Sequence, residues 1–295
     1  MANLKEVRNR IASVSSTQQI TKAMKMVSAA KLKRATNAIV QLRPYANKMK
    51  QLLGSLLGDL ETSNSPFIQS RGAQKVLLIV VSSNRGLAGA FNMNVIKATN
   101  LLISEKYADQ HRKGNLHVVA IGKKAHEFFE RRNFQMIGNN NDIYNKLDFD
   151  NVSKIGAQIM DAFVDGTYDR VELVYNQFRN AAVQILTTEQ LLPVSHLENL
   201  STEADIKQVD YIFEPSQQEI VDRLIPQLVQ IQLYKAVLDS HASEHGARMT
   251  AMDKATENAG DLLKSLKLSY NQARQAAITT ELTEIVSGAA ALANG

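Results

Sequence analysis

The chain contains no cysteine among its 295 residues. This absence excludes a disulfide framework, a thiolate metal site and a thiol nucleophile. No apolar run approaches the roughly 20 residues that span a bilayer, and residues 1–6 lack the apolar core of a secretory signal. We therefore expect no direct membrane insertion and a cytoplasm-like compartment.

Acidic residues are nearly absent from the first fifty positions. Glu6 is the single acidic residue there, against eleven lysines and arginines, whereas the other 245 residues carry 23 basic and 28 acidic side chains. A basic arm on a slightly acidic body suggests a negatively charged partner for the arm. Nucleic acid, an anionic membrane and an acidic protein surface are all open at this point.

Proline and glycine are also scarce, with 5 and 14 residues, and neither occurs before Pro44. From Leu4 to Leu60 a seam recurs at alternating spacings of three and four, and it keeps its phase for eight heptads. Such a pattern favours a coiled-coil helix over a short amphipathic one. We predict a helix over residues 3–58, with a local bend at Pro44, where one backbone hydrogen bond is lost.

The C-terminal end repeats this pattern. Ser216 and Glu219 have the spacing of a capping box, and a second seam runs from Leu224 to Ala277. A helix over residues 216–291 would be on the order of 115 Å long, whereas a compact chain of this length has a radius of gyration of about 19 Å. The two terminal helices are therefore predicted to pair with each other as a long antiparallel coiled coil.

The middle of the chain alternates between short β-rich runs and helical stretches, which is the signature of an open, Rossmann-like α/β sheet. The predicted fold class is thus mixed: a coiled coil of the N- and C-terminal helices with an inserted α/β domain. We place the boundaries at 1–60, 61–74, 75–195, 196–215 and 216–295. The predicted strands are 75–82, 116–121, 170–178 and 182–188, and the predicted helices are 92–107, 125–132 and 152–164.

A search for enzyme chemistry finds little. The turn Asn84–Gly89 follows a strand and precedes a helix, but it lacks the Gly-x-Gly-x-x-Gly spacing and the Gly-Lys-Ser/Thr ending of a nucleotide loop. We interpret its glycines as allowing a tight turn. His241 and His245 share a helical face, yet no third ligand accompanies them at a metal-site spacing. We predict no catalytic residue, no cofactor and no metal.

Polar residues interrupt the first seam. Gln18, Thr21, Lys25 and Ser28 occupy four consecutive seam positions. Polar seam residues can set the register of a coiled coil, or this stretch can be gripped from outside by other proteins. Beyond Tyr270 the second helix also contains polar residues, here among many alanines. Such a slim helix end would fit into a narrow channel formed by other proteins.

Four segments carry a resemblance to a known family. They are residues 20–32 (ITKAMKMVSAAKL), 82–92 (SSNRGLAGAFN), 243–252 (SEHGARMTAM) and 273–290, which contains Ile-Thr-x-Glu-x-x-Glu near the C-terminus. The chain resembles the gamma subunits of rotary, F-type ATP synthases of bacterial type along its whole length. Asn84 departs from the family, which usually has Asp at this position.

The resemblance implies a non-catalytic central-stalk rotor. Its coiled coil would turn inside a hexamer of alpha and beta subunits and transmit torque between that hexamer and an ion-driven membrane c-ring. The implied partners are the alpha, beta and epsilon subunits and the c-ring, with no nucleic acid. The implied location is the cytoplasmic face of the bacterial inner membrane, as a peripheral component, and the implied partner of the basic arm is an acidic loop of the beta subunits.

The family's contact positions can be carried over to this sequence. Tyr211 and Glu214 match the region that rests on the membrane ring. The positions that match contacts with the catalytic beta subunits are Met24, Lys25, Arg248, Arg274, Gln275, Thr279 and Glu281.

Two competing functions are weaker. A nucleic-acid-binding coiled coil is supported only by the basic arm, which has no base-stacking aromatic residue before Tyr45. A nucleotide-dependent enzyme is supported only by the α/β character of the middle.

Overall fold

The computed structural model describes residues 4–58, 65–194, 214 and 216–293. The chain divides into two compact units. One unit is continuous and spans residues 29–248, and we call it the sheet unit. The other combines residues 1–28 with residues 249–295, and we call it the coil unit.

Two long helices begin and end close to the predicted positions. Helix α1 spans Leu4–Gly58 and contains Pro44, and helix α6 spans Gln217–Ala293 and contains Pro226. The Ser216 Oγ accepts a hydrogen bond from the Glu219 amide at 3.2 Å, as expected of a capping residue. Both helices are therefore confirmed, whereas the predicted bend at Pro44 stays a prediction.

The sheet unit contains a five-stranded sheet in the order β3-β2-β1-β4-β5. The first four strands in this order pair in parallel, and β5 pairs antiparallel with β4. Strand β1 lies in the centre and is buried along its whole length, as a continuous apolar run predicts for a parallel strand. The strands are β1 Val76–Val81, β2 Leu116–Ile121, β3 Gln135–Met136, β4 Arg170–Phe178 and β5 Gln184–Leu192.

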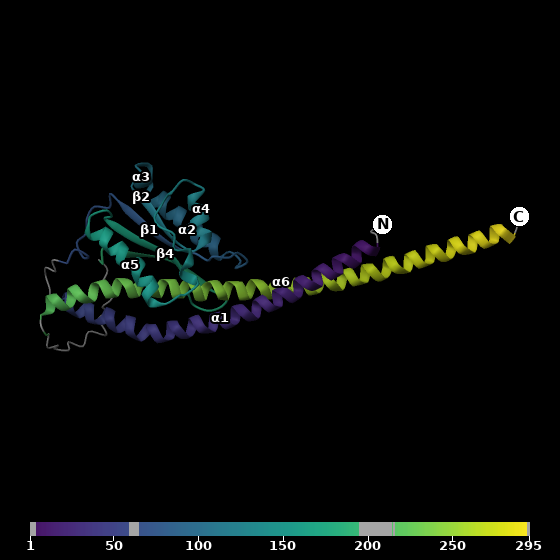
Figure 1. The fold of residues 1–295 in the computed structure, drawn as a ribbon, viewed down its shortest axis with the longest axis horizontal. Helices are drawn as coiled ribbons and strands as arrows, with labels where there is room; N and C mark the ends of the chain where they lie inside the picture. The colour runs from purple at the N-terminus through teal and green to yellow at the C-terminus, as the bar shows by residue number, and fades with distance from the viewer. Residues whose placement is uncertain (1–3, 59–64, 195–213, 215, 294–295) are drawn as a thin grey trace. The chain divides into compact units, whose positions relative to one another are not determined.

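Helices cover both faces of this sheet (Figure 1). One face packs against α2 and α4 in a core that includes Leu78, Val95 and Phe129. The other face packs against α5 and α6 in a core that includes Ile79 and Ile159. The helices are α2 Phe91–Lys106, α3 Ala108–Arg112, α4 Lys123–Glu130 and α5 Phe149–Val164, with a 3-10 turn at Asn141–Tyr144.

Helix α6 is itself a layer of the sheet unit. Val229, Leu233, Ala236 and Val237 are buried in the same core as the inner residues of β1 and β4. These four positions lie off the predicted coiled-coil seam. The predicted domain 75–195 therefore shares its core with the C-terminal helix, and the boundaries drawn from sequence stay a prediction.

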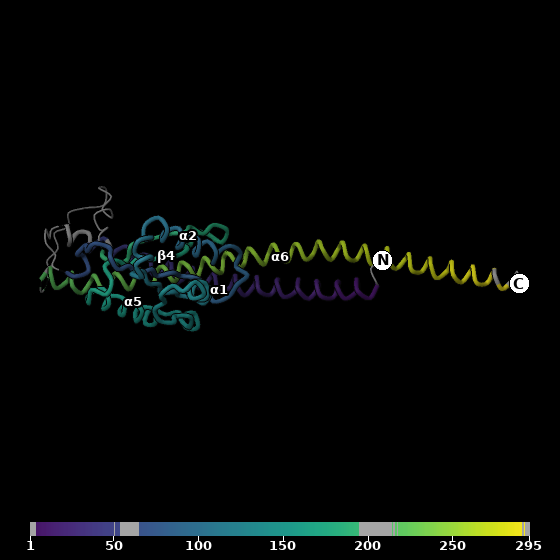
Figure 2. The backbone as a smooth tube through the Cα atoms, turned by 90° about the horizontal axis from the view of Figure 1, so that it is seen from above, coloured from purple at the N-terminus to yellow at the C-terminus, as the bar shows by residue number. Residues whose placement is uncertain are grey.

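The coiled-coil pairing is antiparallel in both units. In the sheet unit, Ala35 and Ile39 of α1 pack against Leu238 and Ala242 of α6. In the coil unit, the Arg8 guanidinium donates to the Tyr270 hydroxyl at 2.9 Å. Within the coil unit, α6 continues past the N-terminal end of α1 (Figure 2).

The structure adds three short elements to the prediction. Helix α3, strand β3 and the 3-10 turn all fall where the sequence predicts a loop or the end of a neighbouring element. Strand β5 ends at Leu192 and not at Thr188. Each addition is short or lies at an edge, where sequence periodicity gives little signal.

Candidate functional site

The turns at the carboxyl end of the sheet are filled by the chain's own atoms. At the start of α4, the amides of Lys123, Lys124 and Ala125 donate to the Asn84 Oδ1, the Ser83 carbonyl and the Ser82 Oγ. A phosphate would need such helix N-terminal amides to be free. This arrangement argues against nucleotide binding, in line with the missing sequence motif.

Gly122 explains how these turns come so close. Its φ is 106°, and a Cβ at this position would clash with the Ser82 carbonyl group. A side chain is therefore incompatible with the contact between the ends of β1 and β2. The glycine serves backbone packing, and no ligand is needed to account for it.

Helix α6 covers the position at which open α/β sheets bind ligands. That position lies outside the carboxyl ends of neighbouring strands where the strand order reverses, which here is the edge between β1 and β4. The Arg248 Nη2 donates to the carbonyls of Arg85 and Gly86 beyond β1, at 3.1 and 3.2 Å. The Ser243 Oγ donates to the Asn176 carbonyl in β4 at 3.1 Å.

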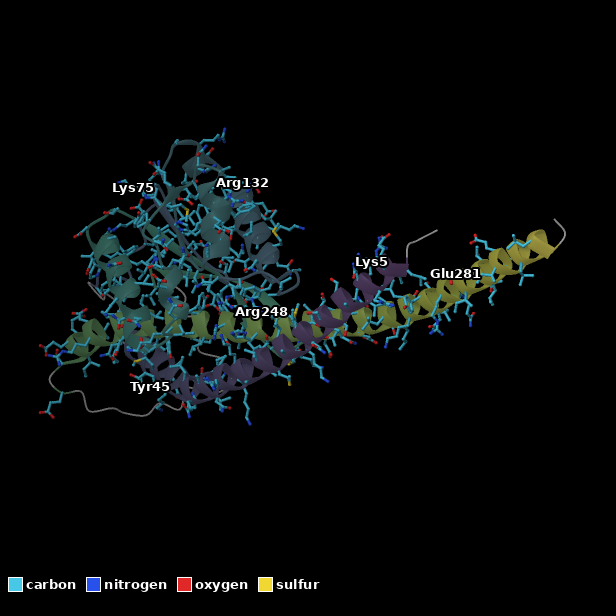
Figure 3. The ribbon with its side chains drawn as sticks, turned by 45° about the vertical axis from the view of Figure 1, so that its right-hand side comes forward. Lys5, Tyr45, Lys75, Arg132, Arg248 and Glu281 are labelled. Carbon is cyan, nitrogen blue, oxygen red and sulfur yellow. The ribbon has the colours of Figure 1, made fainter. Side chains whose placement is uncertain are left out.

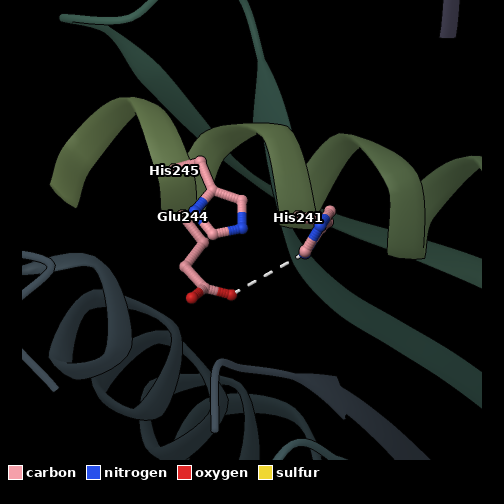
Figure 4. A group of neighbouring side chains, drawn as sticks. All are labelled: His241, Glu244 and His245. Carbon is pink, nitrogen blue, oxygen red and sulfur yellow. Dashed lines mark ion pairs between the residues drawn. The ribbon is translucent and has the colours of Figure 1, made fainter. Parts of the chain in front are cut away.

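His241, Glu244 and His245 lie together on one face of α6 (Figure 4), with one potential ligand atom each within 4.8 Å of one another. Glu244 supplies the third potential metal ligand, which the sequence prediction did not find. Burial lowers the pKa of His241 to about 4 and that of His245 to about 3, so both imidazoles are neutral at pH 7. Neutral imidazoles are the form that binds metals.

The charges around this cluster oppose a cation. The Arg248 Nη1 lies 2.5 Å from Glu244 Oε1 and 3.4 Å from His245 Nδ1, and thus already contacts two of the three residues. Lys31 and Arg85 also act on the cluster through their charges. A metal dication would be a fourth positive group beside the carboxylate of Glu244, after Arg248, Lys31 and Arg85, and these three would repel it. The arrangement is therefore better suited to binding the Arg248 side chain than to binding a metal.

The polar seam residues meet polar partners inside the coil unit. The Thr256 Oγ1 donates to the Thr21 Oγ1 at 2.8 Å, and the Gln18 side chain donates to the Thr256 carbonyl at 3.4 Å. Thr21 and Ser28 are buried. These contacts favour the register interpretation for Thr21 and Gln18, because their polar atoms are directed at α6.

Met24 and Lys25 are half-buried at the same level of the coil unit. The Lys25 Nζ lies 2.5 Å from Asp253 Oδ1 across the two helices, with side chains 40% and 59% exposed. The charge of Lys25 is therefore partly compensated within the chain. Lys22, Lys33 and Arg34 are exposed.

The predicted contact residues near the C-terminus are all exposed. Glu281 projects from α6 into open space in Figure 3. The Thr279 Oγ1 donates to the Gln275 carbonyl one turn earlier at 2.9 Å, which is a local bond that a partner could replace. Arg274, Gln275, Thr279 and Glu281 are thus available to partners, and their assignment to the beta subunits stays a prediction.

Arg248 has a different environment from the other predicted contact residues. Its side chain is 8% exposed and lies between α6 and the turn after β1. Of the two predicted ring contacts, Glu214 is exposed, and Tyr211 lies outside the described residues. Both assignments stay predictions.

Two polar residues of the sheet unit, Asn84 and Asp239, have environments that the sequence did not predict. Asn84 donates through Nδ2 to the Asn141 carbonyl at 2.7 Å and accepts from the Lys123 amide at 2.9 Å. An Asp could not make the first bond, which gives a physical reason for the departure from the family pattern. Asp239 is completely buried on α6, and neither of its carboxylate oxygens has a hydrogen-bond partner within the described part of the chain.

The comparisons with known proteins decide the family. A protein-family model described as ATP synthase matches residues 3–292. The ATP synthase gamma chain of Cytophaga hutchinsonii is 50% identical over 295 residues and is covered completely, as is this chain. That of Flavobacterium psychrophilum is 53% identical over 293 residues, with 99% of each chain covered.

The chain belongs to the ATP synthase gamma chain family. Solved structures with the same fold include the rotor of the Euglena gracilis mitochondrial ATP synthase, with a TM-score of 0.63, 21% identity and coverage of 93% of this chain and 98% of that chain. A second Euglena gracilis structure, of OSCP, F1 and c-ring, gives a TM-score of 0.66 at 19% identity, covering 98% and 94%. In the described part of the chain we find no candidate for a membrane-spanning helix.

Proposed function

We propose that the chain is the central rotor subunit of an F-type ATP synthase and transmits torque between an ion-driven c-ring and a hexamer of alpha and beta subunits. The observation that carries this proposal is the match to gamma chains over essentially the whole length of both proteins. The antiparallel pairing of α1 and α6 supports it, because two packed helices resist twisting together. ATP synthesis and hydrolysis would take place on the hexamer, and this chain would be non-catalytic.

Helix α6 gives the torque a continuous path. Residues such as Leu233 and Val237 anchor it in the core of the sheet unit, and the same helix continues to Ala293. A force applied to the sheet unit therefore acts on α6 through buried contacts and not through a mobile linker. The sheet unit would contact the c-ring and the epsilon subunit, with Tyr211 and Glu214 on the ring side.

The beta subunits would contact the helices from outside. Met24 and Lys25 would meet their acidic loop, and exposed lysines nearby would add to the attraction. Further along α6 the contacts would be hydrogen bonds from short or flexible polar side chains, which form and break readily as the helix turns. These residues are Arg274, Gln275, Thr279 and Glu281.

The complex places the chain at a membrane without inserting it. As a gamma chain it is part of a membrane-associated assembly, and we propose that it lies at the cytoplasmic face of the bacterial inner membrane as a peripheral subunit. The nucleic-acid alternative has no support from the comparisons, because the matched relatives are ATP synthase gamma chains.

Single-molecule rotation tests this proposal directly. The chain has no cysteine, so a single Lys113→Cys substitution in an exposed turn of the sheet unit gives one attachment point for a probe. Assembled with alpha and beta subunits fixed to a surface, the probe should rotate in one direction when ATP is added and stop when ATP is removed. Failure to assemble, or salt-sensitive DNA binding by the chain, would contradict the rotor assignment.

A further inference from the structure

The turn between β1 and α2 is held in a strained conformation. Leu87 has a φ of 63° and Gly89 a φ of 58°. The sequence pattern suggested that the glycines Gly86 and Gly89 allow the turn, but the structure places a leucine, not Gly86, in the left-handed region. A non-glycine residue there costs of order 1 kcal/mol or more and persists only where neighbouring contacts fix it.

Two consecutive carbonyls directly before Leu87 are held by one side chain. The Arg248 Nη2 donates to the Arg85 carbonyl at 3.1 Å and to the Gly86 carbonyl at 3.2 Å. The Ser83 Oγ adds a third hydrogen bond, at 2.7 Å from the Arg85 carbonyl. The residues whose carbonyls are bound are themselves exposed, so without Arg248 this backbone would face water.

Glu244 fixes the guanidinium in place. It lies one helical turn before Arg248 on α6, and its Oε1 is 2.5 Å from the Arg248 Nη1. Both side chains are at most 9% exposed. The Arg248 Nη1 is thus bound to a residue of α6, and its Nη2 is bound to the turn. The planar guanidinium allows this because its two terminal nitrogens donate in different directions.

We propose that Arg248 is a positioning residue that fastens the strained turn Asn84–Gly89 to helix α6. The sheet unit ends at this residue, so the clamp lies at the end of the part of α6 that belongs to this unit. Its role in coupling rests on the proposed rotor function, whereas its role in holding the turn does not. The sequence prediction differs, since it assigns Arg248 to a contact with the beta subunits.

Trypsin provides a readout that a partner contact would not move. The peptide bond after Arg85 is a tryptic site, and its carbonyl is the one that Arg248 and Ser83 bind. In the full-length chain, Arg248→Gln should increase the rate of cleavage after Arg85 by about tenfold, because the turn opens more often once a charged donor is lost. Cleavage after Lys113, in another exposed turn of the sheet unit, should not change.

Three variants sharpen the test. Arg248→Lys keeps the charge but has a single nitrogen, so its cleavage rate should fall between those of the parent chain and Arg248→Gln. Glu244→Gln removes the negative charge beside the guanidinium but keeps an oxygen that can accept from it, and should raise cleavage after Arg85 by about threefold. Arg223→Gln removes an exposed arginine from the same helix and should change nothing.

The assembled complex then links the clamp to rotation. With the probe at position 113, Arg248→Gln should widen the spread of angles at which the probe pauses by about twofold or more. The probe is attached to the sheet unit and therefore reports on how firmly this unit is held.

Each outcome decides between the two roles. Unchanged cleavage after Arg85 together with impaired rotation would overturn the clamp and assign Arg248 to a partner. If Arg248→Gln unfolds the chain, cleavage after Lys113 rises as well, and Glu244→Gln then gives the decisive rate. If the parent chain does not rotate at all, the rotor proposal fails while the cleavage rates still test the clamp.

Discussion

The same two helices are built differently in the two units. In the sheet unit, α6 is buried on more than one face, with apolar residues against α1 and a second apolar set against the sheet. Among the described residues of the coil unit, the buried and half-buried positions of α6 lie on one face, polar residues share the seam, and beyond Tyr270 the helix is largely exposed. The first arrangement favours a fixed structure, and the second leaves surface for partners.

This contrast matches the two demands that a rotor meets. A part that receives force needs a core in which side chains cannot rearrange, and close-packed apolar contacts provide it. A part that turns against other subunits needs contacts that release easily, and exposed polar groups in water are weak enough for that. The four predictions below test this division, beginning with the largest expected effect.

Leu233→Ala should destabilise the sheet unit by about 2–5 kcal/mol, because this leucine is fully buried between α6 and the sheet. The matched variant Leu268→Ala removes a leucine that is 62% exposed in the coil unit and should cost no more than about 0.5 kcal/mol. Urea denaturation followed by circular dichroism measures both. Equal costs would show that the two units do not differ in packing.

Asp239→Asn should stabilise the protein at neutral pH. Burial raises the pKa of Asp239 from 3.8 to about 6, so folding takes up a proton between these values. The free-energy cost of burying the ionised carboxylate is absent below pH 3.8, grows as the pH rises, and is complete above pH 6. There it reaches about 3 kcal/mol, because each pH unit between the two pKa values contributes about 1.4 kcal/mol. Denaturation at pH 4 and pH 8 tests this.

At pH 8 the Asn variant should thus be more stable than the parent chain, whereas near pH 4 the two should be alike. Asp222→Asn, at an exposed position on the same helix, is the control and should change stability by no more than about 0.5 kcal/mol. An equal gain at both pH values would mean that ionisation of Asp239 is not the cause.

Thr21 and Thr256 should couple by about 1 kcal/mol in a double-mutant cycle with valine, since each hydroxyl is paired across the seam. Thr21→Val should cost less stability when Thr256 is already valine, because the bond across the seam is then absent. Each hydroxyl also has a carbonyl acceptor in its own helix, so neither single variant leaves the other hydroxyl without an acceptor. If the stability changes of the two single variants simply add in the double variant, the register role loses its support. The alternative interpretation, in which other proteins contact this stretch, would then be favoured.

Lys25→Gln should have the smallest effect on stability, no more than about 0.5 kcal/mol, because its ion pair with Asp253 is exposed to water. Its effect on docking should be larger. Asp253→Asn breaks the same ion pair but keeps the lysine, so only Lys25→Gln should weaken assembly with beta subunits. Assembly is measured as the ATPase activity that appears when increasing amounts of the chain are added to the alpha and beta subunits. Equal assembly of both variants with the beta subunits would indicate that Lys25 serves only the coiled coil.

The features that sequence predicted well are those encoded by periodicity. The seam positions from Leu4 to Leu53 and from Leu224 to Ala277 are all buried or half-buried wherever their side chains are described. The β-rich run at residues 75–82 likewise predicted the strand that the structure shows as β1. Repetition along a helix or strand places many residues at once, so single exceptions such as Lys25 do not obscure it.

The environment of single polar residues was not predictable in the same way. Arg248 and Arg274 read alike in the sequence, yet one is buried against a turn more than 160 positions earlier and the other is exposed. That difference depends on which face of α6 meets the sheet. A signal was available in Val229, Leu233 and Val237, which lie off the seam and mark a second buried face of this helix.

One contact in the sheet unit has a mechanical consequence. A Cβ at Gly246 of α6 would lie 3.1 Å from the Ala181 Cα and 3.2 Å from its carbonyl oxygen, so the helix meets the β4–β5 connection backbone against backbone. A contact through long side chains can yield under load by a change of rotamer, whereas this contact has no long side chain that could rearrange. We therefore expect the joint to be stiffer here than at contacts made through side chains, so that less of the elastic energy of a rotary step is stored at this point.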